Sequence, residues 1–177
     1  MTIKIGLTGS ISSGKTTASK MIAFNRGPLF SADSIVNKIY KKRRFIKRFL
    51  KNFNLKSSRN LKQKIKFLII KNNKNLKILE KIIHPQVRKE MLIFFKKNKH
   101  RNLIFCEIPL LIESKLNRYF DKIIFVKSNK NLRVNRYKAK GGSLRLFKTL
   151  DSLQIQDIKK MKLCDYVVVN NKSLSIL

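Results

Sequence analysis

Acidic residues are scarce in this chain. Nine Asp and Glu stand against 42 Lys and Arg, a formal charge of +33 in 177 residues. Such an excess indicates either a nucleic-acid-binding protein or compositional drift, since the chain is also rich in Asn, Ile and Phe, whose codons are rich in A and T. The basic residues are spread over the whole sequence. This favours drift, with a weak, salt-sensitive affinity for RNA or DNA and no specific nucleic-acid partner.

Cysteines and long apolar runs are also few. Cys106 and Cys164 each lie in or beside an apolar run, which favours reduced thiols over a disulfide, and no Cys/His cluster has zinc spacing. No apolar run approaches the ~20 residues that span a bilayer, and the first residues lack the features of a secretory signal. We expect a cytoplasmic, monomeric protein with no membrane partner, formed by residues 1–177 as one domain.

The richest local signal is the run GSISSGKT at residues 9–16, the pattern of a phosphate-binding loop. It follows the apolar stretch Ile3–Leu7 and leads into a helical stretch, as the pattern requires. Loop N–H groups and the helix dipole hold phosphate oxygens, Lys15 reaches the β- and γ-phosphates, and the Thr16 hydroxyl binds Mg²⁺. The loop therefore predicts ATP and Mg²⁺ as cofactors. The expected nucleotide-binding residues are Gly9, Ser10, Ile11, Ser12, Ser13, Gly14, Lys15, Thr16 and Thr17.

Strand-like and helical stretches alternate, which predicts an α/β fold with a parallel sheet between helices. The expected strands are Ile3–Leu7, Leu29–Ser31, Leu103–Glu107, Lys122–Val126 and Tyr166–Val169, the last a β-branched run typical of a strand covered on both faces. The expected helices are Lys15–Phe24, Ser34–Asn52, Asn60–Lys71, Asn75–Lys97, Asn129–Lys138 and Leu144–Lys162. Residues 34–97 hold no convincing strand and form a helical insertion suited to binding a substrate.

Two acids follow strands at the sheet edge where ligands bind in such folds. Asp33, after Leu29–Ser31, could accept the proton of an attacking hydroxyl, or could instead cap the helix beginning at Ser34. Glu107 ends the third strand and could hold the Mg²⁺ shell, or could be a surface acid paired with a lysine.

Two further stretches are weaker candidates. His84 could contact the substrate or be structural, and Pro85 would by itself explain a helix break. The run from Arg133 to Gly142 ends in a glycine pair, which suits either a lid over nucleotide phosphates or an ordinary solvated helix face.

Taken together, the motifs resemble the dephospho-coenzyme A kinase family, from Ile3 to about Asn171. The phosphate loop is joined by Ala32-Asp33, by Leu79-Glu80 with His84-Pro85, and by the run Glu107 to Glu113, which is similar to the family's acid-x-Pro-Leu-Leu-x-Glu element. Near the end, the spacing of the family's Gln…Asp…Asn-Asn element falls on Gln154, Asp165, Asn170 and Asn171.

The resemblance implies a three-layer P-loop fold with a five-stranded parallel sheet, a helical CoA-binding insertion at about 34–97 and a lid at about 136–145. It also implies ATP-dependent phosphorylation of the 3′-hydroxyl of dephospho-CoA. The alternatives are another small-molecule or nucleotide kinase on the same core, an inactive relative, or a basic nucleic-acid-binding protein. The resemblance implies catalytic roles for Asp33, Lys15, Arg136 and Lys140, substrate contacts for Asp33, His84, Pro109, Leu110 and Glu113, an adenine-side contact for Asn170, and metal binding by Thr16 and Glu107.

Two positions depart from the family pattern. Ser31 replaces the first acid of its Asp-Ala-Asp element, which removes a carboxylate from the metal shell. Lys140 stands where the lid of the family usually carries a second Arg, and a lysine cannot make the two-pronged contact of a guanidinium.

Overall fold

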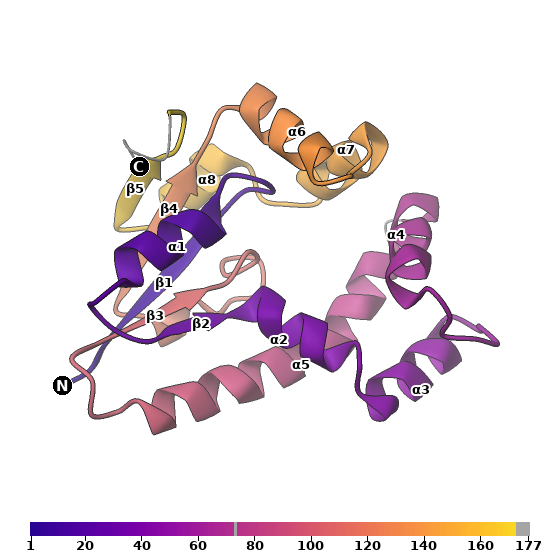
Figure 1. Ribbon diagram of the computed structural model, residues 1–177, viewed down its shortest axis with the longest axis horizontal. Helices are drawn as coiled ribbons and strands as arrows, with labels where there is room; N and C mark the ends of the chain where they lie inside the picture. Colours follow the sequence, from indigo (N-terminus) through magenta and orange to yellow (C-terminus); the bar gives the residue numbers. More distant parts are fainter. Residues whose placement is uncertain (73, 173–177) are drawn as a thin grey trace.

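The fold is a twisted sheet of five parallel strands, in the order β2-β3-β1-β4-β5, flanked by helices (Figure 1). It is described from a computed structural model, which covers residues 1–72 and 74–172. The sheet confirms the predicted α/β class. Its strands are β1 (Ile3–Gly9), β2 (Leu29–Ser31), β3 (Leu103–Glu107), β4 (Lys122–Lys127) and β5 (Tyr166–Val169).

The helices fall into two groups. Four of them, α2 to α5, lie between β2 and β3 in the chain, and α3 and α4 pack on α5 at the end away from the sheet (Figure 1). The others follow β1 or lie between β4 and β5, and α7 also contacts α4. The helices are α1 (Lys15–Ala23), α2 (Ala32–Ile39), α3 (Arg43–Asn52), α4 (Leu61–Lys71), α5 (Lys74–Lys97), α6 (Lys130–Ala139), α7 (Leu144–Ser152) and α8 (Asp157–Met161), with a 3₁₀ turn at Asn117–Tyr119.

Apolar burial holds these parts together. The large core cluster runs from the sheet residue Cys106 to helix residues such as Ile39, Phe49 and Met91, so α2 to α5 share one core with the sheet. A smaller cluster of Leu7, Ala23 and Phe105 packs α1 on the sheet. At about 25 cal/mol per Å² of buried apolar surface, this burial is the main force that fixes the sheet edge where the site lies.

The structure corrects several details of the predicted elements. The helix expected over 34–52 is two helices, because the chain turns at Tyr40–Lys42, where the Tyr40 ring packs on Phe45. The helix expected over 144–162 is likewise α7 and α8. The helix predicted over Asn75–Lys97 is confirmed by α5, which runs through Pro85. Proline leaves one helix carbonyl without its N–H donor, here that of the exposed residue Lys81, where water can replace it.

The expectation that β5 is covered on both faces is also wrong. Tyr166, Val167 and Val169 are exposed, because β5 pairs with β4 at one edge of the sheet. A β-branched run is equally typical of a buried strand and of an edge strand, and only the strand order separates the two.

The sequence predicted reduced cysteines and no membrane-spanning segment, and both can be compared with the described part of the chain. Cys106 and Cys164 are both free there, and burial raises the pKa of both thiols, that of Cys164 to about 11. None of the described helices is both long and apolar enough to cross a membrane.

Candidate active site

The phosphate loop lies between the end of β1 and the start of α1, as its pattern predicts. Gly14 has φ 88° and stands at the N-cap of α1, where a Cβ would collide with the side-chain nitrogen of Asn170. Gly9, at φ 154°, lies against the Val126 carbonyl in the same way. Both positions therefore require glycine. Because the first N–H groups of a helix have no acceptor within it, the loop directs free donors at a bound anion.

Lys15 begins α1 and is buried. Its ammonium donates a hydrogen bond to the Ser10 carbonyl oxygen at 2.7 Å, so the side chain lies over its own loop. Burial lowers the pKa of Lys15 to about 8; the charges of Asp33 and Glu107 oppose this shift, and those of Lys160 and Arg133 add to it. Because burial disfavours the charged form of Lys15 despite these two acids, a bound phosphate would stabilise its ammonium further.

Thr16 and Glu107 meet beside Lys15. The Thr16 hydroxyl donates to Oε1 of Glu107 at 2.6 Å, and the Glu107 side chain is only 2% exposed at the end of β3. One hydroxyl and one carboxylate fit the oxygen ligands that Mg²⁺ prefers, with phosphates and water as the rest of its shell. No cluster of three or more His, Cys, Asp or Glu suited to a metal occurs in residues 1–72 and 74–172. The donor set fits Mg²⁺ held partly by a nucleotide.

Asp33 lies in the first turn of α2, between two cavities. It lines a cavity of about 320 Å³ with Lys15, Thr16 and Glu107, and it also belongs to the lining of a second cavity of about 180 Å³. The alternative role as helix N-cap is wrong, because α2 begins at Ala32 and its N-cap is Ser31. Asp33 is exposed and acts on Lys15 through its charge.

The second cavity, called here the acceptor cavity, lies between α2, α5 and the loop after β3. Its lining is largely apolar and includes the predicted substrate residues His84, Pro109 and Leu110. Burial and the charge of Arg88 lower the pKa of His84, and burial with the charge of Glu113 raises the pKa of Glu80. The lowered pKa favours a neutral His84 at neutral pH, and the raised pKa makes Glu80 easier to protonate than an ordinary glutamate.

Glu113 takes a different place. It lies outside the described lining of the acceptor cavity and pairs with Lys160 at 2.5 Å. Its contact with the substrate stays a prediction. The partner is hard to find in the sequence, since Lys160 is one of 42 basic residues.

The predicted lid residues lie at two depths. Lys140 lines the phosphate-loop cavity, whereas Arg136 lies deeper and donates to Ser128 Oγ at 3.0 Å and to the Asn170 carbonyl at 3.2 Å. Asn170 is 6% exposed and donates to the Ser13 carbonyl at 2.9 Å. Asn170 thus bonds the phosphate loop at Ser13, and Arg136 in turn bonds Asn170. Contacts of either residue with a nucleotide stay predictions.

Some residues near the site carried no signal in the sequence. Lys66 of α4 and Tyr137 of α6 line the phosphate-loop cavity. The bonds that hold the far side of the phosphate loop come from Gln154 and Asp157. The spacing of the family's Gln element pointed to Gln154 but assigned it no contact.

Comparison with known proteins agrees with this geometry. The family model described as dephospho-CoA kinase matches residues 3–175. The chain belongs to the dephospho-CoA kinase family. A dephospho-CoA kinase of Fusobacterium nucleatum is 32% identical, with 98% of this chain and 92% of that protein covered. Among solved structures, a Thermus thermophilus protein gives a TM-score of 0.76 at 27% identity (98% and 91% covered), and the dephospho-CoA kinase of Campylobacter jejuni gives 0.65 at 26% (99% and 92% covered).

Membership of the dephospho-CoA kinase family makes Ser31 informative. The Ser31 hydroxyl accepts a hydrogen bond from the Ser34 N–H at 3.4 Å and so caps α2. Serine and aspartate are both good helix caps. Ser31 therefore provides the helix start that positions Asp33 without a carboxylate.

Proposed function

We propose that this chain phosphorylates the 3′-hydroxyl of dephospho-CoA with ATP, yielding CoA and ADP. The observation that carries the proposal is the place of Asp33, whose side chain lines both the phosphate-loop cavity and the acceptor cavity. A carboxylate at that junction can orient an alcohol in one cavity toward a phosphoryl group in the other.

The residues then divide the work by position. The phosphate loop and Lys15 hold the triphosphate, and Thr16 with Glu107 hold Mg²⁺, which supplies charge neutralisation when bound. Asp33 accepts the hydroxyl proton as the hydroxyl oxygen bonds to the γ-phosphorus and the bond to the bridging oxygen of ADP breaks. Lys140 and Arg136 neutralise charge on the transferring group.

The acceptor cavity has a largely apolar lining, which suits an apolar part of dephospho-CoA. The three predicted contacts His84, Pro109 and Leu110 lie in its wall with the half-buried Val36 and the buried Ile83. A neutral His84 can both donate and accept hydrogen bonds with amide and hydroxyl groups of a substrate, and the Glu80 carboxyl in the same lining can accept them.

The protein is proposed to act as a cytoplasmic monomer. Its basic surface would draw two anionic substrates toward the sheet edge by long-range attraction, independently of its origin. Raising the salt concentration should therefore raise KM for both substrates more than it lowers kcat.

The decisive assay measures CoA and ADP formed from ATP and dephospho-CoA, with and without Mg²⁺. Nucleoside monophosphates and shikimate serve as competing acceptors, and the Lys15→Ala variant serves as the inactive control. Turnover that requires Mg²⁺ and prefers dephospho-CoA supports the proposal. Transfer to another acceptor, or RNA binding with no ATP turnover in the wild type, would replace it with one of the alternatives.

A further inference from the structure

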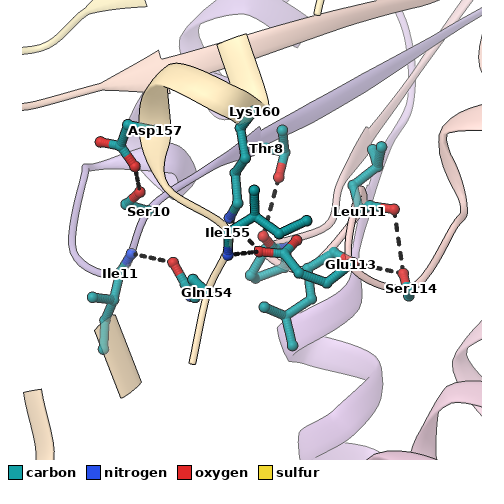
Figure 2. Close-up of polar contacts among 12 residues, drawn as sticks. Thr8, Ser10, Ile11, Leu111, Glu113, Ser114, Gln154, Ile155, Asp157 and Lys160 are labelled. Atoms are coloured by element: carbon teal, nitrogen blue, oxygen red, sulfur yellow. Dashed lines mark hydrogen bonds and ion pairs between the residues drawn. The ribbon is translucent and has the colours of Figure 1, made fainter. Parts of the chain in front are cut away.

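One short stretch of chain holds the phosphate loop on its outer side. This stretch, the bridge segment (residues 154–160), comprises the last three residues before α8 and the first four residues of α8. The Gln154 side-chain oxygen accepts a hydrogen bond from the Ile11 N–H at 3.2 Å, and the Asp157 carboxylate accepts one from the Ser10 hydroxyl (Figure 2). Both contacted residues belong to the loop that holds phosphate.

The same segment also holds the loop after β3, called here the acceptor loop (residues 108–116). Lys160 Nζ lies 2.5 Å from Oε1 of Glu113, and the Ile155 N–H donates to that same oxygen at 3.2 Å. Figure 2 shows the Lys160 side chain running from α8 down to Glu113, past the Thr8 side chain of β1. Pro109 and Leu110 of this loop line the acceptor cavity.

Stability alone does not explain why a charged lysine is buried at position 160. Its side chain is 0% exposed and that of Glu113 is 15% exposed. Removing both charges from water costs more than a well-packed apolar pair would, and such pairs often give no net gain in stability. What the pair offers instead is a fixed partner, because separating the two buried charges would leave each of them uncompensated at a large cost.

The remaining contacts of this region point the same way. The Thr8 hydroxyl, one residue before the phosphate loop, donates to the Pro109 carbonyl at 3.0 Å. The Ser114 hydroxyl donates to the Leu110 carbonyl at 2.6 Å, which closes the acceptor loop on itself. A closed acceptor loop moves as one unit, so the position of Glu113 also sets the position of Pro109 and Leu110.

We propose that the bridge segment, with Lys160 as its central positioning residue, fixes the acceptor loop relative to the phosphate loop and so aligns the acceptor alcohol with the γ-phosphoryl group. This inference rests on the proposed function. Lys160 makes its ion pair with Glu113 of the acceptor loop, and its charge also acts on Lys15. Since a misplacement of about 1 Å can cost about 10²-fold in rate, loosening the segment should slow the chemical step more than it weakens either binding step.

The test uses three changes that break the segment at different points. Gln154→Ala removes the bond to Ile11, Asp157→Ala removes the bond to Ser10, and the double change Lys160→Met with Glu113→Gln removes both buried charges together. Dissociation constants are measured for a non-hydrolysable ATP analogue and, separately, for dephospho-CoA, with single-turnover rates beside them. We expect the rate of each variant to fall about 10- to 100-fold, while each dissociation constant stays within about threefold of the wild type.

Two controls separate geometry from charge. Lys159→Met removes the same charge from an exposed position on the same helix and should leave the rate within about twofold. Asp157→Asn keeps an oxygen that can accept the Ser10 hydroxyl, so it should restore most of the rate lost in Asp157→Ala. If the rate of Asp157→Ala fell only because the protein was less stable, Asp157→Asn would not be expected to restore it.

Each outcome decides between the possibilities. A folded double variant with a rate within twofold of the wild type overturns the inference, and so does a rate loss explained entirely by weaker nucleotide binding. If the double variant fails to fold, Gln154→Ala and Asp157→Ala decide by the same criteria. Wild-type protein that binds neither ATP nor dephospho-CoA would instead overturn the proposed function and, with it, this inference; wild-type turnover with unaffected variants overturns the inference alone.

Discussion

The Thr16 hydroxyl and the Glu107 carboxylate lie 2.6 Å apart, joined by a hydrogen bond across the carboxyl ends of two neighbouring strands. Thr16 is at the start of α1, directly after the phosphate loop, and Glu107 ends β3. Two segments far apart in the chain thus bring together the oxygen ligands of the proposed Mg²⁺ site.

Changing Glu107 to Gln should weaken Mg²⁺ binding without unfolding the protein. The amide keeps an acceptor for Thr16 but loses the negative charge, and losing one metal-shell partner costs about 10- to 100-fold in metal affinity. A Mg²⁺ titration of the rate should therefore show half-maximal activity at a concentration at least about tenfold higher. Glu90→Gln, which affects only a surface pair with Lys42, is the control; an identical Mg²⁺ curve for both variants would refute the assignment.

Asp33→Asn should leave substrate binding nearly intact and reduce kcat by about 10²- to 10⁴-fold, the usual contribution of general acid–base catalysis. The amide keeps the shape of Asp33 but cannot take the hydroxyl proton. The measurement is steady-state kinetics with both substrates varied. Asp121→Asn serves as control, because its side-chain oxygen can still accept the Lys4 N–H. Near-normal turnover in a folded Asp33→Asn protein would remove this residue from the mechanism.

Nucleotide affinity should fall as the pH rises above about 8, where the buried Lys15 loses its proton in the free protein. If one proton must be bound, the limiting slope is about tenfold in dissociation constant per pH unit above the pKa. Titration calorimetry with an ATP analogue from about pH 6.5 to about pH 9.5, on both sides of the lowered pKa, measures this. The Lys15→Met variant should bind the ATP analogue weakly, and its dissociation constant should not depend on pH in this way. An equal pH dependence in both proteins would show that a group other than Lys15 causes it.

The same lowered pKa has an opposite consequence for folding. Unfolded Lys15 has its ordinary pKa of 10.5, so between about pH 8 and 10.5 the unfolded chain binds more protons than the folded one. The contribution of Lys15 to the free energy of unfolding therefore rises with pH across this window. Comparing the unfolding free energies of wild type and Lys15→Met at about pH 7.5 and about pH 9.5 isolates this contribution. If the difference between the two proteins does not change with pH, the pKa of Lys15 is not lowered in the folded protein.

Gly14→Ala should destabilise the protein more than Gly141→Ala, although both glycines have positive φ. An L-residue in the left-handed region costs about 1–3 kcal/mol at either site. At Gly14 the new Cβ would also meet the Asn170 side chain, whereas at Gly141 nothing lies within 4 Å. Chemical denaturation of both variants measures the difference, and nucleotide affinity should fall only for Gly14→Ala. Equal losses of stability would show that the Asn170 side chain moves away from the new Cβ at little cost.

Local patterns predicted those parts that depend on neighbours along the chain. The phosphate loop is one continuous run, and its glycines and Lys15 fix its own geometry. All five strands were predicted within two residues of their bounds, since strand periodicity and turns are local. Helix breaks were not predicted where tertiary contacts make them, as at Leu153–Gln156, where Gln154 and Ile155 turn their polar groups to the phosphate and acceptor loops.

The sequence by itself determined the phosphate loop, the parallel α/β class and the family, because each depends on residue types at fixed short spacings. Only the tertiary structure decided that Asp33 lies between two cavities, that β5 is an exposed edge, and that one lysine among 42 basic residues is buried against Glu113. The physical reason is that the burial of a charge depends on which segment packs against it, and segments distant in sequence meet only when the common apolar core forms.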